Sequence, residues 1–145
     1  MESAPQGLSV YLADTSAWHR TDDPGVARAW QELLNADSLA TCAQVRLEIL
    51  YSARSATDYQ RLGSELLALH QLECGAEQFV RALEVQRELA LQGGMHHRSV
   101  KIADLLIAAC AESAGAAVWH YDEDYERIAA VTGQPTEWIA LRGSL

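Results

Sequence analysis

Short apolar runs alternate with longer helical patterns along this chain, and that alternation limits the possible folds more than any other feature. It is typical of a parallel sheet covered by helices, because each helix returns the chain to the edge where the next strand begins. Strands are predicted at residues 9–13, 38–42, 117–121 and 138–141. Helices are predicted at residues 26–35, 44–54, 57–72, 76–92, 99–113 and 124–131. The expected fold class is therefore α/β.

The length and composition indicate one folded domain. A chain of 145 residues can bury a hydrophobic core but is short for two domains, and 49% hydrophobic with 21% charged residues is ordinary globular usage. We therefore expect a single domain over residues 1–145, with residues 1–7 and 143–145 as loose tails. The opening residues lack the basic start and apolar run of a secretory signal, and no apolar stretch reaches the ~18 residues of a membrane span. A cytoplasmic protein without membrane contact is expected.

The charge and the cysteines argue against some kinds of function. Acidic residues outnumber basic ones by 20 to 11, and the net charge of −9 argues against a broad basic face for nucleic acid. A nucleic-acid partner must then be bound locally. Cys42, Cys74 and Cys110 are far apart and odd in number, without the paired spacing of a zinc site or a redox dithiol. They are predicted to be reduced and mostly buried.

A carboxylate follows the first predicted strand. In VYLADTS, residues 10–16, four apolar residues lead directly into Asp14. Asp122 follows the strand at 117–121 in the same way. Ligands of parallel sheets gather at the carboxyl ends of the strands, and a buried carboxylate needs hydrogen bonds, an opposite charge or a metal ion. Both acids are therefore candidates for a site at that edge.

Two further acids lie on predicted helices in apolar surroundings. Glu48 comes just over one turn into the helix after the second strand, so its side chain should point at the same crevice. Asp104 has Val100, Ile107 and Ala108 at its i−4, i+3 and i+4 positions, so its own face of the helix is apolar there. A surface helix would place an acid among polar residues. Asp104 is therefore either buried with a partner or part of a site.

The other acids also have structural explanations, which stay open at this point. Asp14 could end its strand in a turn, with hydrogen bonds to the next amides. Glu48 could pair with Arg54 or Lys101. The acids after the strand at 117–121 could simply open the final helix, because the positive end of the helix dipole stabilises negatively charged side chains there. These explanations would all have to hold at once, which makes a shared site the better hypothesis.

The chemistry of such a site follows from its ligands. Clustered carboxylates repel one another unless a cation neutralises them, and hard oxygen ligands favour Mg²⁺ or Mn²⁺. Such ions hold a phosphodiester and lower the pKa of a bound water molecule. The pattern therefore predicts a site for phosphoryl chemistry, in which the metal supplies the positive charge that this acidic chain lacks.

The acidic motifs resemble, in order and spacing, those of the PIN-domain ribonucleases. The motifs are Asp14 in YLADTSAW, Glu48 in CAQVRLEIL, Asp104 in SVKIADLLIAACA, and Asp122 with Asp124 in VWHYDEDYERIA. Each motif is weak alone, but the four in order cover nearly the whole chain. The size and the ending HYDEDYERIA are most similar to the VapC toxins of bacterial toxin–antitoxin pairs.

The resemblance implies a three-layer α/β/α sandwich with a mostly parallel central sheet, and RNA cleavage by a Mg²⁺- or Mn²⁺-dependent endoribonuclease. It implies these roles: Asp14, Glu48 and Asp104 as core catalytic, metal-binding acids, Asp122 as the fourth metal-site acid, Asp124 as a supporting acid, and Ser16 as a residue that orients ligands or water. His120 stands where the wider family often has threonine, so the role of that position is open.

The resemblance also implies partners: an RNA substrate such as tRNA or another structured RNA, a cognate antitoxin, and a second copy in a homodimer. The leucine-rich helix at 57–72 and the amphipathic helix at 76–92 are either core-facing or the surface for those partners. On the second helix the apolar face includes Phe79 and Leu83. RNA could be contacted by the turn His96, His97 and Arg98, which could equally be a solvated turn.

Two rival functions remain. A phosphatase with a strand-end aspartate nucleophile normally has a second aspartate two residues later, and position 16 is serine. A non-catalytic PIN-like module that binds RNA or protein would be expected to have lost a core acid. None is missing here, so the nuclease is the preferred function, and a metal titration separates it from the binding module.

Overall fold

The computed structural model describes residues 9–145. Within them, one five-stranded sheet has the order β4-β3-β2-β5-β6, and every pairing is parallel. The strands are β2 (Tyr11–Ala13), β3 (Leu39–Cys42), β4 (His70–Leu72), β5 (Ala117–His120) and β6 (Thr136–Trp138). Leu12 in the central strand is paired with Ala40 on one side and Val118 on the other. All three side chains are fully buried, as expected for strands covered on both faces.

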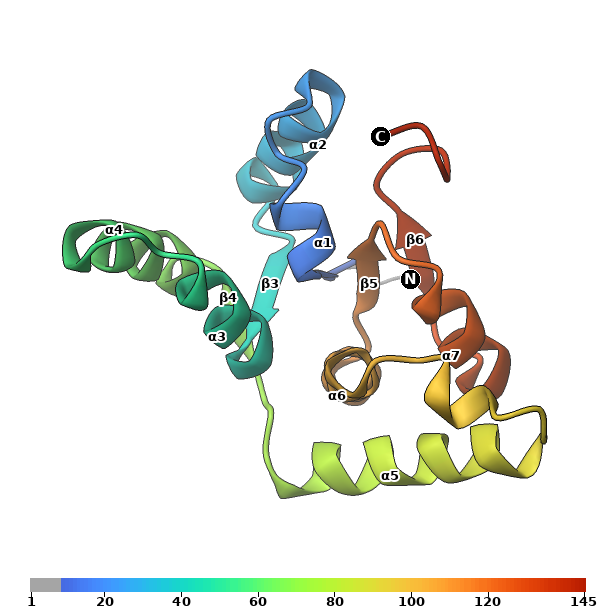
Figure 1. The fold of residues 1–145 in the computed structure, drawn as a ribbon. Helices are drawn as coiled ribbons and strands as arrows, with labels where there is room; N and C mark the ends of the chain where they lie inside the picture. The colour runs from blue at the N-terminus through green and yellow to red at the C-terminus, as the bar shows by residue number, and fades with distance from the viewer. Residues whose placement is uncertain (1–8) are drawn as a thin grey trace.

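Helices cover the sheet, which confirms the expected α/β/α arrangement (Figure 1). They are α1 (Thr15–Trp18), α2 (Pro24–Asn35), α3 (Ala43–Tyr51), α4 (Ala56–Leu67), α5 (Ala76–Leu91), the 3₁₀ turn η1 (His96–Arg98), α6 (Ile102–Ala114) and α7 (Asp124–Thr132). Helix α6 lies between the long helix α5 and the strands. Its side chains from Asp104 to Ala111 are all buried, so α6 is the central helix of the core. No helix within residues 9–145 is long and apolar enough to cross a membrane.

One strand was not predicted from the sequence. Residues 70–72 fall at the end of the helix predicted at 57–72, but α4 ends at Leu67 and these residues pair with β3 as an edge strand. Three residues are too short to show the alternation that marks a strand, and two of the three are exposed. The last strand lies at 136–138 rather than 138–141. The other three strands lie within their predicted ranges.

The two helices considered as partner surfaces behave differently. On α4, Leu62 and Leu66 are buried in the core, so most of its leucine-rich face is structural. On α5, Phe79 and Leu83 are exposed, and Leu89 is buried instead. The sequence predicts that the apolar face of α5 meets a core or a partner. Where that face carries Phe79 and Leu83, it is exposed to solvent on this chain.

Only one of the two expected tails lies within the residues that the structure describes. Residues 1–7 lie outside them. Residues 143–145 lie beyond the last strand, and the backbone N–H of Leu145 donates to the hydroxyl of Tyr121 at 2.8 Å.

Candidate metal site at the carboxyl edge of the sheet

Asp14 is buried at the end of the central strand, with only 3% of its surface exposed. Its Oδ2 accepts hydrogen bonds from the backbone N–H of Ser16 at 3.0 Å and from the Ser16 hydroxyl at 2.5 Å. Its Oδ1 accepts one from the hydroxyl of Tyr125 at 2.6 Å. The turn interpretation is therefore correct for one oxygen, whereas the other is directed to a tyrosine 111 residues further along the chain.

Asp104 lies in the first turn of α6 and is 5% exposed. Its Oδ1 is 3.3 Å from the Tyr125 hydroxyl, and its buried Oδ2 has no hydrogen-bond partner within residues 9–145. The ammonium group of Lys101 lies 3.5 Å from Oδ2. Burial, and then the negative charge of Asp14, raises the pKa of Asp104 to about 9. A stronger cation at this position would favour the ionised carboxylate.

Lys101 joins the acids at this edge of the sheet. Its Nζ lies 2.8 Å from Asp122 Oδ2 and 3.0 Å from Asp124 Oδ2, in addition to its contact with Asp104. Carboxylate oxygens of these three acids all lie within 4.8 Å of one another. Burial lowers the pKa of Lys101, but the hydrogen bonds to Asp122 and Asp124 outweigh it and the net shift is upward. The ammonium group of Lys101 thus forms ion pairs with all three acids.

Asp122 and Asp124 are held by the start of the last helix. Oδ1 of Asp122 accepts from the backbone N–H of Asp124 at 3.0 Å. Oδ2 of Asp124 accepts from the backbone N–H of Lys101 at 3.0 Å, and its Oδ1 lies 3.2 Å from Arg127. Burial opposes ionisation of Asp122, but Lys101 and the Asp124 amide hold its pKa below the usual value. The helix-opening interpretation is therefore compatible with membership of the cluster.

Glu48 lies on α3 and is half-buried; within residues 9–145 it does not belong to the converging group of Asp104, Asp122 and Asp124. Its carboxylate accepts hydrogen bonds from the Thr15 hydroxyl at 2.5 Å and from the Gln44 side chain at 3.0 Å. Among the described residues it forms no ion pair with Arg54 or Lys101, and Lys101 contacts the other acids instead. Thr15 directly follows Asp14, so this bond ties Glu48 to the turn that carries the first acid.

Two neighbours of the acids are also fixed by hydrogen bonds. The Ser16 hydroxyl, besides donating to Asp14, accepts from the backbone N–H of Tyr121 at 2.9 Å. His120 is fully buried, and its Nδ1 accepts from the backbone N–H of Asp122 at 3.1 Å. Burial lowers the pKa of His120 to about 4, so the imidazole is neutral and positions the loop that carries Asp122.

The candidate RNA-contact residues form the 3₁₀ turn η1, which ends three positions before Lys101. His96 and Arg98 are exposed and His97 is half-buried. Among the described residues, no hydrogen bond or ion pair joins these side chains to the acids. They lie close to the site in sequence, without being part of it.

Sequence reasoning missed Tyr125, Thr15 and Gln44, and it considered Lys101 only as a partner of Glu48. Lys101 carried a usable signal, since it is the only lysine of the chain and precedes Asp104 by three positions. Tyr125 carried none, because a buried aromatic residue in a helix is ordinary core composition. Its role depends on where its hydroxyl points.

The residues present fit a hard divalent cation. The carboxylate oxygens of Asp104, Asp122 and Asp124 converge, and in the described part of the chain one buried oxygen of Asp104 lacks a hydrogen bond. The Lys101 ammonium already lies among them, which shows that the position attracts positive charge. Oxygen ligands of this kind select Mg²⁺ or Mn²⁺ over softer metals.

The parallel sheet, with acids gathered at its carboxyl edge, defines the class of protein. The family model of the PIN domain matches residues 11–131, and this chain belongs to the PIN-domain family. Within it, the chain is 62% identical over 136 residues to Ribonuclease VapC18 of Mycobacterium tuberculosis (strain ATCC 25618 / H37Rv), covering 94% of this chain and 99% of that one. It is 45% identical to Ribonuclease VapC51 of the same strain, over 93% of this chain and 96% of the relative.

Solved structures show the same fold at low sequence identity. The DNA-bound VapBC complex from Salmonella typhimurium has a matching chain with a TM-score of 0.72 and 18% identity, covering 92% of this chain and all of that one. VapBC-5 from Mycobacterium tuberculosis matches with a TM-score of 0.58 and 23% identity, over 92% of this chain and all of the other.

Proposed function

We propose that this chain is a metal-dependent endoribonuclease that acts in the cytoplasm as the toxin of a toxin–antitoxin pair. The observation that carries the proposal is the convergence of the Asp104, Asp122 and Asp124 oxygens, with Asp14 linked to Asp104 through Tyr125. The names of the relatives support RNA as the substrate, since each is a ribonuclease. The reaction is hydrolysis of an RNA phosphodiester bond.

The cation is Mg²⁺ or Mn²⁺, and the residues that would hold it are Asp14, Glu48, Asp104 and Asp122, with Asp124 in support. When bound, such an ion supplies a Lewis acid that offsets phosphate charge and lowers the pKa of a water molecule. The protein supplies orientation: Tyr125 holds the carboxylates of Asp14 and Asp104, and Ser16 holds the second oxygen of Asp14.

Lys101 has a second role in this proposal. Its ammonium competes with a divalent cation for the same acids, so it must move when the metal binds. The side chain is 64% exposed, which allows it to swing towards solvent. There its charge can meet the phosphate backbone of the substrate, close to the η1 turn with His96, His97 and Arg98. A tRNA or another structured RNA bound at this local basic edge would avoid the remaining acidic surface.

An antitoxin is the expected inhibitor. Several structural neighbours are toxin–antitoxin complexes, which supports a partner of that kind. Helix α4 exposes Tyr59 and Leu67 on its outer face and is the helix at which we expect contact. A basic antitoxin side chain that reached the acids would make charge-assisted hydrogen bonds where Lys101 or a metal otherwise lies. Co-purification of this chain with the product of a neighbouring gene tests this partner.

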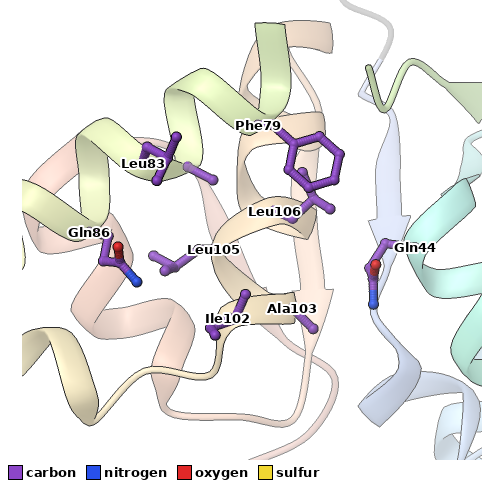
Figure 2. Close-up of a pocket in the computed structure, with 9 residues that line it drawn as sticks. Gln44, Phe79, Leu83, Gln86, Ile102, Ala103, Leu105 and Leu106 are labelled. Atoms are coloured by element: carbon purple, nitrogen blue, oxygen red, sulfur yellow. The ribbon is translucent and has the colours of Figure 1, made fainter. Parts of the chain in front are cut away.

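A second copy is proposed to cover the exposed apolar surface formed by Leu47, Tyr51, Phe79, Leu83 and Ile102. Leu47 and Tyr51 share a face of α3 with Gln44, which lines a pocket of about 310 Å³ between α5 and α6. Figure 2 shows Phe79 and Leu83 on α5 across from Ile102 on α6. Homodimer interfaces are more apolar than other interfaces, and this surface has that character.

Cleavage by purified, antitoxin-free protein tests the function. Structured RNA should be cut in Mg²⁺ or Mn²⁺, and cutting should stop when a chelator is added. The matched control is the Asp104→Asn protein from the same preparation, which exposes contaminating nucleases. Cleavage that survives excess chelator would show that the mechanism does not depend on a metal. A folded protein with no affinity for either ion would instead be a binding module.

A further inference from the structure

Three cysteines that are far apart in the sequence meet inside the protein. Cys42 ends β3, Cys74 lies in the loop between β4 and α5, and Cys110 lies on α6. All three are free thiols, and their sulfur atoms lie within 4.8 Å of one another. Cys42 and Cys110 are fully buried, and Cys74 is half-buried. The expectation of reduced, buried cysteines agrees with this, but the spacing gave no sign of a cluster.

The surroundings favour negative charge on Cys42, whereas the hydrogen bond with the Cys42 thiol, and then burial, raise the pKa of Cys110 well above its usual value. Cys42 is the N-cap residue of α3, and Cys74 comes immediately before Gly75, the N-cap of α5. The positive ends of two helices therefore lie beside two of the three thiols. The Cys110 thiol and, after it, the backbone amides of Val45 and Gln44 hold the pKa of Cys42 below its usual value, against the effect of burial.

We propose that Cys42, Cys74 and Cys110 form a binding site for a thiophilic metal ion, separate from the acidic site. A metal ion uses all three converging sulfurs, whereas a disulfide would join two and leave the third unused. Thiolates select soft ions such as Cu⁺ and Zn²⁺, and not the Mg²⁺ or Mn²⁺ expected at the carboxylates. Within residues 9–145, no histidine or carboxylate belongs to this group of ligand atoms.

The ligand number bears on which ion binds. Structural zinc sites almost always have four ligands, so Zn²⁺ would need an external ligand on the side of Cys74, which is the partly open side. Cu⁺ needs no fourth ligand. In either case each thiol that binds releases one proton to solvent, because the thiolate is the ligand. A bound ion would join β3, α6 and the start of α5, the same frame that positions Glu48 and Asp104.

Titration of the full chain, reduced and stripped of metal, tests the site. Cu⁺ is added without oxygen against a competing chelator, and Zn²⁺ is added in a separate experiment, both with excess Mg²⁺ present. One equivalent should bind, with a thiolate-to-metal absorption band and a matching mass in native mass spectrometry. At 100-fold excess over the Kd, the melting temperature should rise by roughly 5–10 °C. Binding of either ion supports the site and identifies its metal.

Two variants decide the assignment. Cys74→Ser changes the half-buried loop position, where folding is least at risk, and should weaken binding by about 100-fold or more, since even partners outside the ligand set contribute ~10- to 100-fold. Cys110→Ala repeats the test from the buried helix. Asp104→Asn should leave the absorption band unchanged, because carboxylates produce none, and this separates the site from the proposed nuclease centre.

The proposal is wrong if neither ion produces the band or the mass shift, or if the cysteine variants bind as tightly as the parent. It is also wrong if binding is lost in Asp104→Asn, because the ion would then lie in the acid cluster. Formation of a disulfide on treatment with hydrogen peroxide, in a protein that binds neither ion, would assign the cluster to redox chemistry instead.

Discussion

The hydroxyl of Tyr125 donates a hydrogen bond of 2.6 Å to Asp14 Oδ1, and the two residues are separated by 111 positions in the sequence. The same hydroxyl is 3.3 Å from Asp104. Burial, and then the charges of Asp14 and Asp104, raises the pKa of Tyr125 well above its usual value, so the hydroxyl stays a donor at neutral pH. One neutral side chain therefore sets the distance between two acids from different elements.

Tyr125→Phe should reduce cleavage by about 10- to 100-fold, because the ring is kept while the group that orients Asp14 is lost. The free energy of unfolding should fall by about 1–3 kcal/mol, since a buried carboxylate oxygen loses its donor. Kinetics and urea unfolding measure the two effects. Tyr59→Phe, at an exposed position of α4, is the matched control and should change neither. Full activity in Tyr125→Phe would exclude an orienting role.

Asp104→Asn should abolish cleavage and yet melt, in chelator at neutral pH, at the same temperature as the parent or higher. The substitution keeps the shape of the side chain and removes a carboxyl group that burial and Asp14 make costly to ionise. Mg²⁺ should raise the melting temperature of the parent more than that of the variant. If Asp104 serves mainly as a buried ion-pair partner, its loss should instead cost about 3 kcal/mol or more, with cleavage retained.

The stability of the metal-free protein should fall as pH rises from 7 to 8. The pKa of Asp104 is about 9 in the folded chain and lies near the ordinary aspartate value when unfolded, so its contribution is fully present below about 4 and is lost as pH rises through 9. The slope cannot exceed about 1.4 kcal/mol per pH unit for this one proton.

Urea unfolding in chelator, at pH 7, 7.5 and 8, measures this slope. His120 does not interfere, because its pKa of about 4 is lowered from the ordinary value, and its contribution changes only as pH falls below about 6.5. Asp104→Asn should show a flatter dependence. With saturating Mg²⁺ the stability of the parent should become nearly independent of pH over this range, since the ion displaces the proton from Asp104. Equal slopes for parent and variant in chelator would mean that Asp104 is already ionised.

Lys101→Met should lower the melting temperature in chelator, because Asp104, Asp122 and Asp124 lose the cation that holds them together. Mg²⁺ should then raise the melting temperature of this variant more than that of the parent, since no ammonium competes for the site. Cleavage should still fall if Lys101 contacts the substrate phosphate. Arg28→Met removes an exposed cation on α2 and serves as the control. A variant with unchanged response to Mg²⁺ would show that the ammonium and the metal do not compete.

Leu83→Arg should convert a dimer into a monomer, because a charge would be buried in the centre of the apolar surface. Light scattering on the purified protein measures the mass. Leu141→Arg places the same charge at another exposed leucine, outside the α3, α5 and α6 surface, and should leave the dimer intact. A parent protein that is monomeric at high concentration would contradict the proposed dimer directly.

The sequence by itself determined the fold class and which acids are candidates for a shared site. The strands around Leu12, Leu39 and Val118 were recognisable because both of their faces are buried, which produces continuous apolar runs. Asp104 stood out for a related reason, since its own helical face is apolar and it proved to be buried. These signals are local: burial dictates residue type within a few positions of the chain.

Contacts between distant segments were decided only by the tertiary structure. Lys101 among the acids, Tyr125 between Asp14 and Asp104, and the meeting of Cys42 with Cys110 all depend on the order of the strands and the packing of α6 against them. The edge strand His70–Leu72 also depends on β3 for its hydrogen bonds. A linear pattern records which residues are buried, whereas the direction of a side chain towards a partner is set by the register of elements that fold together.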